Sequence, residues 1–318
     1  MSVYTELTRD EIIAIVGGYN LGGLHNFTNI AAGIENSNFF IDTDRGRFVL
    51  TIFERLDRNS IPWFMQLMHH LSHHGLPCPD VQSQRNDGAM LFDYGEKSGC
   101  IVSCLPGSIM DQLSETQLRS AGVALAQLHA AGEDFRPVRS NPTGAEWLDV
   151  TANQVMAEAR NRYGDNAVAL LAEEISWQKA HHTEGLPQGI IHGDYFCDNI
   201  LFDGDDVAGI IDFYYAHTAP WVMDIAIAIN ALAIKLGEDD TPRMMAFMEG
   251  YQRVRRLTDA EQQALPALLR LAALRFWLSR LYDAIFPRDG AMTQSKDPEE
   301  YRHKLLLHRN YSAHALFF

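Results

Sequence analysis

The most informative stretch of this sequence is IIHGDYFCDNILF, residues 190–202. Its apolar start is typical of a buried strand and leads into a loop that carries Asp194. Asn199 follows five residues later, at the start of a second apolar run. The chain then turns at DGDD, residues 203–206, and returns along another apolar run that presents Asp212. A tight hairpin turn here predicts that Asn199 and Asp212 lie at the same end of paired strands, close to Asp194.

Two carboxylates and an amide in this arrangement indicate phosphoryl transfer. One carboxylate can orient an attacking hydroxyl and accept its proton, while the amide and the other carboxylate hold a divalent cation against phosphates. Oxygen ligands suit Mg²⁺, which is a hard cation. We predict that Asp194 is the catalytic base and that Asn199 and Asp212 bind magnesium. These residue types are also common in turns, but the joint pattern H-G-D-x-x-x-x-N, strand, turn, strand, D is more specific than any of its parts.

Periodicity and turn signals divide the chain into a small β-rich part and a larger, mainly helical part. Strands are predicted at residues 38–41, 48–53, 88–92 and 100–104, with a further β region at residues 190–213. Capping boxes predict helix starts at Thr8, Ser114 and Thr258, and further helices are predicted at residues 63–74, 149–162 and 166–181. The expected fold class is α+β, with an N-terminal lobe at residues 1–104 and a helical lobe at residues 105–318.

The composition argues against several classes of partner. With 26 Lys and Arg against 41 Asp and Glu, the formal net charge is −15, which repels nucleic acid and anionic membranes. No stretch approaches the roughly 18 apolar residues of a membrane span, and the N-terminus has no apolar signal core. The four cysteines form no CxxC pair. We therefore expect a cytoplasmic protein that binds neither nucleic acid nor membrane.

The stretch around Asp194 resembles the catalytic loop of the protein-kinase-like superfamily. HGD takes the place of HRD, and Asp212-Phe213-Tyr214 takes the place of the DFG segment. The HGD form is similar to the aminoglycoside phosphotransferase and choline kinase branch. Within this branch the chain resembles the bacterial homoserine kinases nearly end to end. The matching stretches are GIENSNF at 33–39, FVLTIFE at 48–54, FCDNILF at 196–202, GIIDFYY at 209–215, LRFWLSRLY at 274–282 and KDPEEY at 296–301.

This resemblance implies a two-lobed protein-kinase-like fold and ATP- and Mg²⁺-dependent phosphorylation of the L-homoserine hydroxyl to O-phospho-L-homoserine, in threonine biosynthesis. It also implies a turn over the phosphates, from Gly33 to Asn38, and connector backbone that contacts adenine. The residues implied in nucleotide binding are Gly33, Glu35, Asn36, Ser37, Ser103 and Leu105.

The chain departs from the broader kinase pattern in two places. Thr51 stands where most kinases have a phosphate-binding lysine, and the predicted helix at residues 63–74 has no glutamate to pair with one. Arg55 or Arg58 could supply the missing positive charge, although a solvated surface arginine is the simpler interpretation of each.

Homoserine is a zwitterion, so its site needs a cation for the carboxylate. Arg275 and Arg280 lie in a strongly apolar helical stretch, where an unpaired arginine is costly. Either could bind the carboxylate, or form an internal ion pair with Asp283 or another acidic residue. Tyr214 is a further candidate for substrate contact. The resemblance also implies that Asp224 supports the catalytic loop.

Four histidines, at positions 69, 70, 73 and 74, form two i,i+4 pairs, a spacing that can bind zinc. We find no carboxylate or cysteine nearby that completes a set of ligands, and interpret the pairs as a hydrated helix face. His129, at the end of an apolar stripe, is expected to be a hydrogen-bonded core histidine.

Two other functions remain open at this point. One is a kinase of another small alcohol, such as an aminoglycoside, choline or hydroxylysine. The other is a nucleotide-binding pseudokinase, which the missing lysine favours and the intact set of Asp194, Asn199 and Asp212 opposes.

Overall fold

The computed structural model describes residues 5–30, 36–181, 184–237, 240–287 and 296–310. The chain divides into two compact units. The first runs to Gly107 and also includes Ala208–Ile211, whereas the second comprises Ser108–Val207 and continues from Asp212. The sequence placed a single boundary between residues 104 and 105, and the return of Ala208–Ile211 to the first unit was not anticipated.

An antiparallel sheet with strand order β1-β2-β3-β5-β4 forms the centre of the first unit. Its strands are β1 (Leu24–Ile30), β2 (Asn36–Thr43), β3 (Gly46–Phe53), β4 (Phe92–Tyr94) and β5 (Lys97–Ser103). The β2–β3 hairpin confirms the prediction. The strand predicted at residues 88–92 is wrong, because β4 begins at Phe92 and Gly88 has a positive φ of 75°. Strand β1 was missed.

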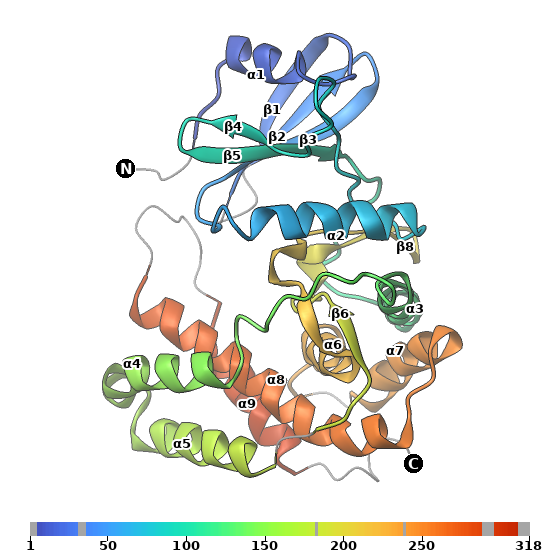
Figure 1. Cartoon of the computed structure of the whole chain (residues 1–318). Coiled ribbons are helices and arrows are strands. Elements are labelled where there is room, and N and C mark those ends of the chain that lie inside the picture. The colour runs from blue at the N-terminus through green and yellow to red at the C-terminus, as the bar shows by residue number, and fades with distance from the viewer. Residues whose placement is uncertain (1–4, 31–35, 182–183, 238–239, 288–295, 311–318) are drawn as a thin grey trace. The chain divides into compact units, whose positions relative to one another are not determined.

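Helices lie on both sides of this sheet (Figure 1). The predicted capping box of Thr8 and Glu11 is formed at the start of α1 (Arg9–Val16). Ile12 and Val16 of this helix are buried in one apolar core with sheet residues such as Leu50. On the other side of the sheet lies α2 (Ile61–His73).

The second unit is mainly helical (Figure 1). Its α-helices are α3 (Glu115–Ala131), α4 (Ala145–Tyr163), α5 (Asp165–Ala180), α6 (Trp221–Ala228), α7 (Thr241–Val254), α8 (Asp259–Ile285) and α9 (Pro298–His308). The predicted capping boxes at Ser114 and Thr258 are formed. Helices α4, α5, α8 and α9 share an apolar core that contains Trp277 and Tyr301. None of the described helices combines the length and the apolar character needed to cross a bilayer.

Two short β ladders interrupt the helices and carry the catalytic stretch. Strand β6 (Gln188–Ile191) pairs with β9 (His217–Pro220), and β7 (Ile200–Asp203) pairs with β8 (Asp206–Ile210). The predicted β region thus consists of a hairpin, β7–β8, preceded by a strand whose partner lies beyond it. Strand β9 was not predicted.

Helices α3 and α7 pack so closely that two glycines are required between them. A Cβ atom at Gly122 would lie 2.1 Å from the carbonyl oxygen of Phe247, and a Cβ atom at Gly250 would lie 1.9 Å from that of Arg119. Both obstacles are backbone atoms, so the helices themselves would have to move apart.

We predict that Gly250→Ala lowers the free energy of unfolding by about 3 kcal/mol, because overpacking a close helix contact forces backbone shifts. Urea unfolding followed by circular dichroism measures this change. The control is Gly23→Ala, whose new Cβ would meet a side-chain oxygen of Asp44 at 3.4 Å, an ordinary contact distance. Equal stability of the Gly250→Ala variant and the wild type would contradict the packing described.

Candidate functional site

The turn at Gly193 places the catalytic loop at the end of β6. Gly193 has a φ of 77°, a backbone conformation that residues other than glycine rarely adopt. A Cβ atom here would also lie 2.6 Å from the carbonyl oxygen of Tyr215. Both constraints explain why the motif has glycine between His192 and Asp194.

Asp224 of α6 is fully buried and holds this loop in place through hydrogen bonds. Its two carboxylate oxygens accept hydrogen bonds from the backbone N–H groups of His192, at 2.7 Å, and Gly193, at 2.9 Å. His129 Nε2 lies 3.1 Å from the same carboxylate, and His129 Nδ1 lies 2.7 Å from the hydroxyl of Tyr251. These contacts confirm that Asp224 supports the catalytic loop and that His129 is a hydrogen-bonded core residue.

The protonation states of this buried pair follow from its contacts. Burial acts to raise the pKa of Asp224, but the hydrogen bonds from His129 and from the loop outweigh it and lower the pKa overall. Burial lowers the pKa of His129. The carboxylate of Asp224 is therefore ionised, and it accepts a hydrogen bond from Nε2 of His129, whose Nδ1 lies beside the hydroxyl of Tyr251.

Asp194 and Asn199 are in direct contact. The side-chain nitrogen of Asn199 donates to the Asp194 carbonyl oxygen, at 2.9 Å, and to its carboxylate, at 3.2 Å. This orientation leaves the amide oxygen of Asn199 as the atom that can bind a cation. Burial raises the pKa of Asp194, and the nearby charges of Arg275 and His192 act in the opposite direction. A carboxylate with a raised pKa is a better proton acceptor than an ordinary surface aspartate.

Asp212 follows β8, the strand that pairs with β7, and Asn199 immediately precedes β7. Its φ and ψ are both 64°, and among the described residues it alone has a positive φ without being glycine. Such strained conformations concentrate at functional sites. The next residue, Phe213, is buried and its ring packs 4.9 Å from that of His192. The exposed carboxylate of Asp212 is an oxygen ligand of the kind that Mg²⁺ requires.

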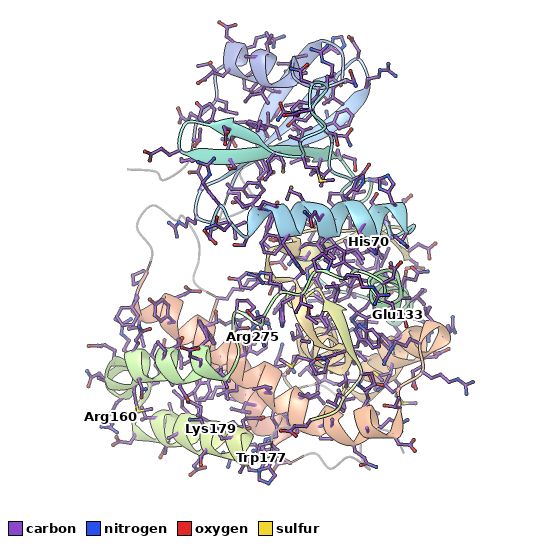
Figure 2. All side chains as sticks on the ribbon, viewed as in Figure 1. His70, Glu133, Arg160, Trp177, Lys179 and Arg275 are labelled. Atoms are coloured by element: carbon purple, nitrogen blue, oxygen red, sulfur yellow. The ribbon has the colours of Figure 1, made fainter. Side chains whose placement is uncertain are left out.

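Arg275 of α8 is buried against the catalytic loop (Figure 2). Its Nη1 atom donates to the carbonyl oxygen of Gly193 at 2.6 Å. Burial lowers the pKa of Arg275, and the charge of Asp194 acts to raise it. Arg275 also lines a cavity of about 340 Å³ whose wall includes Asp149 and Lys179. Among the described residues, no carboxylate forms an ion pair with it.

Arg280, five residues further along α8, has different partners. Its Nη1 lies 2.6 Å from a carboxylate oxygen of Glu300 and 2.9 Å from the carbonyl oxygen of Asp297. Its guanidinium also lies over the ring of Tyr301. This is the internal ion pair with an acidic residue that the sequence left open, and Glu300 is the partner that forms it. Tyr214 is half-buried on the short 3₁₀ turn that follows Asp212.

The residues expected to bind nucleotide lie in the first unit. Gly33 and Glu35 fall outside the described residues. The expectation that Asn36 and Ser37 belong to a turn is wrong, because both are buried at the start of β2. Their placement follows from pairing with the end of β3.

Two of the residues expected to bind nucleotide, Ser37 and Ser103, already use a hydrogen-bond donor within the first unit. The hydroxyl of Ser37 donates to Glu54 at 2.6 Å. At the connector, the Ser103 N–H donates to the carbonyl oxygen of Asp80 at 2.9 Å. Leu105 follows β5 in irregular backbone.

At the position where most kinases have a phosphate-binding lysine, the first unit has a pair of polar side chains. Thr51 donates to the side-chain oxygen of Asn38, its cross-strand partner, at 2.8 Å. Lys97 is the one lysine in the first 107 residues of the sequence, and it forms an ion pair with the buried carboxylate of Glu54. Arg58 forms an exposed ion pair with Asp93, which fits a surface arginine. The sequence did not single out the Glu54–Lys97 pair, because its partners are far apart along the chain.

Comparisons with known proteins match this chain over nearly its whole length. Residues 26–260 fit the family described as "Phosphotransferase enzyme family". The homoserine kinase of Methylobacillus flagellatus is 40% identical over 312 residues, which are 97% of this chain and 95% of the relative. The homoserine kinase of Rhizobium meliloti is also 40% identical, with the same coverage of 97% and 95%.

Solved structures share the fold. A structure of the amicoumacin kinase hAmiN with AMP-PNP, Ca²⁺ and Ami superimposes with a TM-score of 0.72 at 15% identity, covering 98% of this chain and 97% of that one. An aminoglycoside phosphotransferase from Alicyclobacillus acidocaldarius gives a TM-score of 0.66 at 17% identity, with coverage of 98% and 95%. The predicted two-lobed kinase-like α+β fold is confirmed.

We predict that Asp224→Asn lowers kcat about a hundredfold, because its amide nitrogen cannot accept the second loop N–H and the loop loses its anchor. The same variant should lose about 2 kcal/mol of stability to an unsatisfied buried donor. Steady-state kinetics and urea unfolding measure the two effects. Asp203→Asn, in the exposed hairpin, serves as the control and should change neither. A fully active Asp224→Asn enzyme would show that Asp194 is held by other contacts.

Proposed function

The chain belongs to the phosphotransferase enzyme family, and we propose that it transfers the γ-phosphoryl group of ATP to the side-chain hydroxyl of L-homoserine. The observation that carries this proposal is the contact between Asp194 and Asn199 on a loop fixed by Asp224. The substrate is supported by relatives at 40% identity over nearly the entire chain.

In this proposal Asp194 orients the homoserine hydroxyl and accepts its proton at a carboxylate oxygen. The raised pKa of Asp194 strengthens it as a base, and the nearby charge of Arg275 limits that rise. Asn199 holds the carboxylate in place by donating to it. Positioning of this kind accounts for much of the rate enhancement in phosphoryl transfer, which needs no covalent intermediate.

The oxygen donors at this site fit magnesium. The amide oxygen of Asn199 and the carboxylate of Asp212 would hold Mg²⁺, which neutralises charge on the phosphate oxygens when bound. The strained backbone of Asp212, followed directly by the buried Phe213, supports its assignment as a ligand.

For the nucleotide, we retain Gly33, Glu35, Asn36 and Ser37 as residues near the phosphates, and Ser103 and Leu105 at adenine. Because the Ser103 N–H is used by Asp80, the main-chain groups of Leu105 are the better candidates for hydrogen bonds to the adenine ring.

For the amino acid, Arg275 is the favoured partner of the homoserine carboxylate. Arg280 already has its counter-ion in Glu300, whereas Arg275 uses one donor on Gly193 and has four N–H groups left. A buried guanidinium of this kind can bind a carboxylate through two parallel hydrogen bonds. Tyr214, next to the metal ligand Asp212, remains a candidate for a further contact.

A coupled assay of ADP formation across homoserine, serine, threonine, choline and kanamycin tests the proposed substrate. We expect homoserine to have the highest kcat/KM, with formation of O-phospho-L-homoserine and dependence on Mg²⁺. Asp194→Asn should lower kcat about a thousandfold while ATP still binds. A higher kcat/KM for another alcohol would overturn the substrate, and no ADP formation with any of them would favour a pseudokinase.

The role of Arg275 is tested by comparing homoserine with 3-amino-1-propanol, which has the same hydroxyl and amine but no carboxylate. Arg275→Met should lower kcat/KM for homoserine about a hundredfold more than for 3-amino-1-propanol, because a charge-assisted bond to the carboxylate is lost. An equal loss for both substrates would show that Arg275 only positions the loop. Arg280→Gln is the matched control, and should reduce stability without changing the preference for homoserine.

A further inference from the structure

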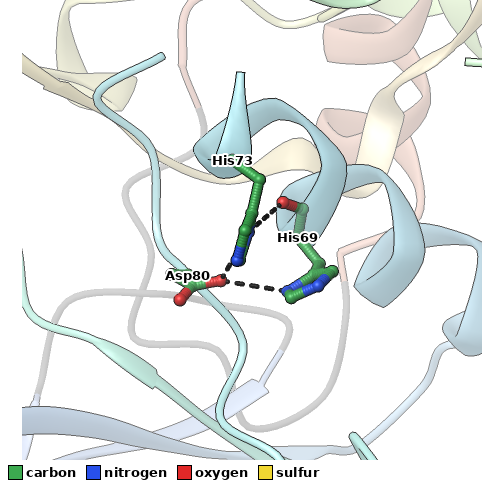
Figure 3. A group of neighbouring side chains, drawn as sticks. All are labelled: His69, His73 and Asp80. Atoms are coloured by element: carbon green, nitrogen blue, oxygen red, sulfur yellow. Dashed lines mark hydrogen bonds and ion pairs between the residues drawn. The ribbon is translucent and has the colours of Figure 1, made fainter. Parts of the chain in front are cut away.

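The C-terminal end of α2 carries a cluster of metal-binding side chains outside the catalytic site (Figure 3). His69 and His73 are four residues apart on one face of the helix, and Asp80 reaches them from the segment that follows. The expectation that no carboxylate lies near this pair is therefore wrong. The missing ligand comes after the turn at Gly75, which has a φ of 84° and brings the chain back along the helix.

The distances within the cluster approach those of a metal site. Nδ1 of His69 lies 3.2 Å from Oδ1 of Asp80. The ring of His73 is also close, since its Nδ1, which the metal ion would not use, lies 3.7 Å from the same oxygen. One ligand atom from each residue can be chosen so that all three lie within 4.8 Å of one another. Zinc bonds of about 2.1 Å place tetrahedral ligands about 3.4 Å apart. The three side chains are partly exposed, so small rotations suffice to close this gap.

Hydrogen bonds already orient one histidine of the cluster and the backbone of Asp80. Nδ1 of His73 donates to the backbone carbonyl of His69 at 2.8 Å, which leaves the lone pair of Nε2 for a metal ion. Metal-binding histidines usually donate their second ring nitrogen in this way. Asp80 is fixed by Ser103, since its N–H donates to the Ser103 hydroxyl at 2.9 Å and its carbonyl oxygen accepts from the Ser103 N–H at 2.9 Å.

We propose that His69, His73 and Asp80 bind a first-row transition-metal dication of the Zn²⁺ class, with water at the fourth position. Two imidazoles and one carboxylate are a ligand set that zinc accepts, and Mg²⁺ disfavours imidazole nitrogen. The site is chemically distinct from the oxygen ligands Asn199 and Asp212. The ion would connect the end of α2 to the segment around Asp80, which is hydrogen-bonded to Ser103, and so stabilise this part of the first unit.

Zinc titration of the untagged full-length protein tests the site, using a chromophoric chelator as competitor and millimolar Mg²⁺ to occupy oxygen-ligand sites. We expect the double variant His69→Gln/His73→Gln to bind Zn²⁺ at least about a hundredfold more weakly than the wild type, and Asp80→Asn about tenfold more weakly. Zinc should raise the melting temperature of the wild type and not that of the double variant. Phosphotransfer activity with Mg²⁺ and ATP shows that each variant is folded.

The matched control is His70→Gln/His74→Gln, which removes the adjacent i,i+4 pair from the same helix. The two rings lie 4.0 Å apart in each pair. This control should leave the tightest zinc site unchanged. Wild-type affinity in the His69→Gln/His73→Gln variant, or an equal loss in the control, would overturn the proposal. An unchanged affinity in Asp80→Asn would overturn the three-ligand site as well.

Discussion

The geometry of the catalytic loop depends on one buried carboxylate, that of Asp224. It accepts two hydrogen bonds from the backbone of His192 and Gly193, and a third contact with His129 connects it to α3. These three partners offset the cost of burying the Asp224 carboxylate, whereas losing one of them would lower the stability of the fold. The loop conformation is thus tied to the core of the second unit, and the position of Asp194 depends on hydrogen bonds made by the two residues before it.

A second consequence concerns charge. Asp194 is buried enough to raise its pKa, and a buried arginine, Arg275, sits close enough to oppose that shift. Arg275 is itself held by the carbonyl of Gly193, one residue from Asp194. Two helices, α6 and α8, therefore contact the same short loop, and the carboxylate of Asp194 has a raised pKa and an arginine nearby. The fold neighbours share the overall fold at 15–17% identity, so the fold by itself does not identify the substrate.

Much of the fold could be predicted from local signals. The three capping boxes at Thr8, Ser114 and Thr258 specify helix starts because both partners lie within four residues, and all three are formed. The β2–β3 hairpin was equally local. Strand β1 was missed because its sequence, LHNFTNI, does not alternate between apolar and polar residues. Its extended conformation depends on pairing with β2.

In the site, too, local contacts could be predicted from the sequence and contacts between distant elements could not. The contact of Asp194 with Asn199 spans five residues, and the sequence motif indicates it. The pairing of Arg280 with Glu300, the approach of Asp80 to two histidines, and the Glu54–Lys97 pair all join separate elements. Single-sequence patterns carry no signal for such contacts, because tertiary packing alone brings these side chains together. The same reason explains why the sequence left Arg275 and Arg280 equivalent.

The most direct measurement is a crystal structure of the protein with Mg²⁺, a non-hydrolysable ATP analogue and L-homoserine. It should show the homoserine hydroxyl within about 2.6–3.2 Å of an Asp194 carboxylate oxygen, with oxygen atoms of Asn199 and Asp212 bound to the metal ion. A hydroxyl that faces another side chain, or a metal ion held without Asn199 and Asp212, would contradict the role assigned to this loop.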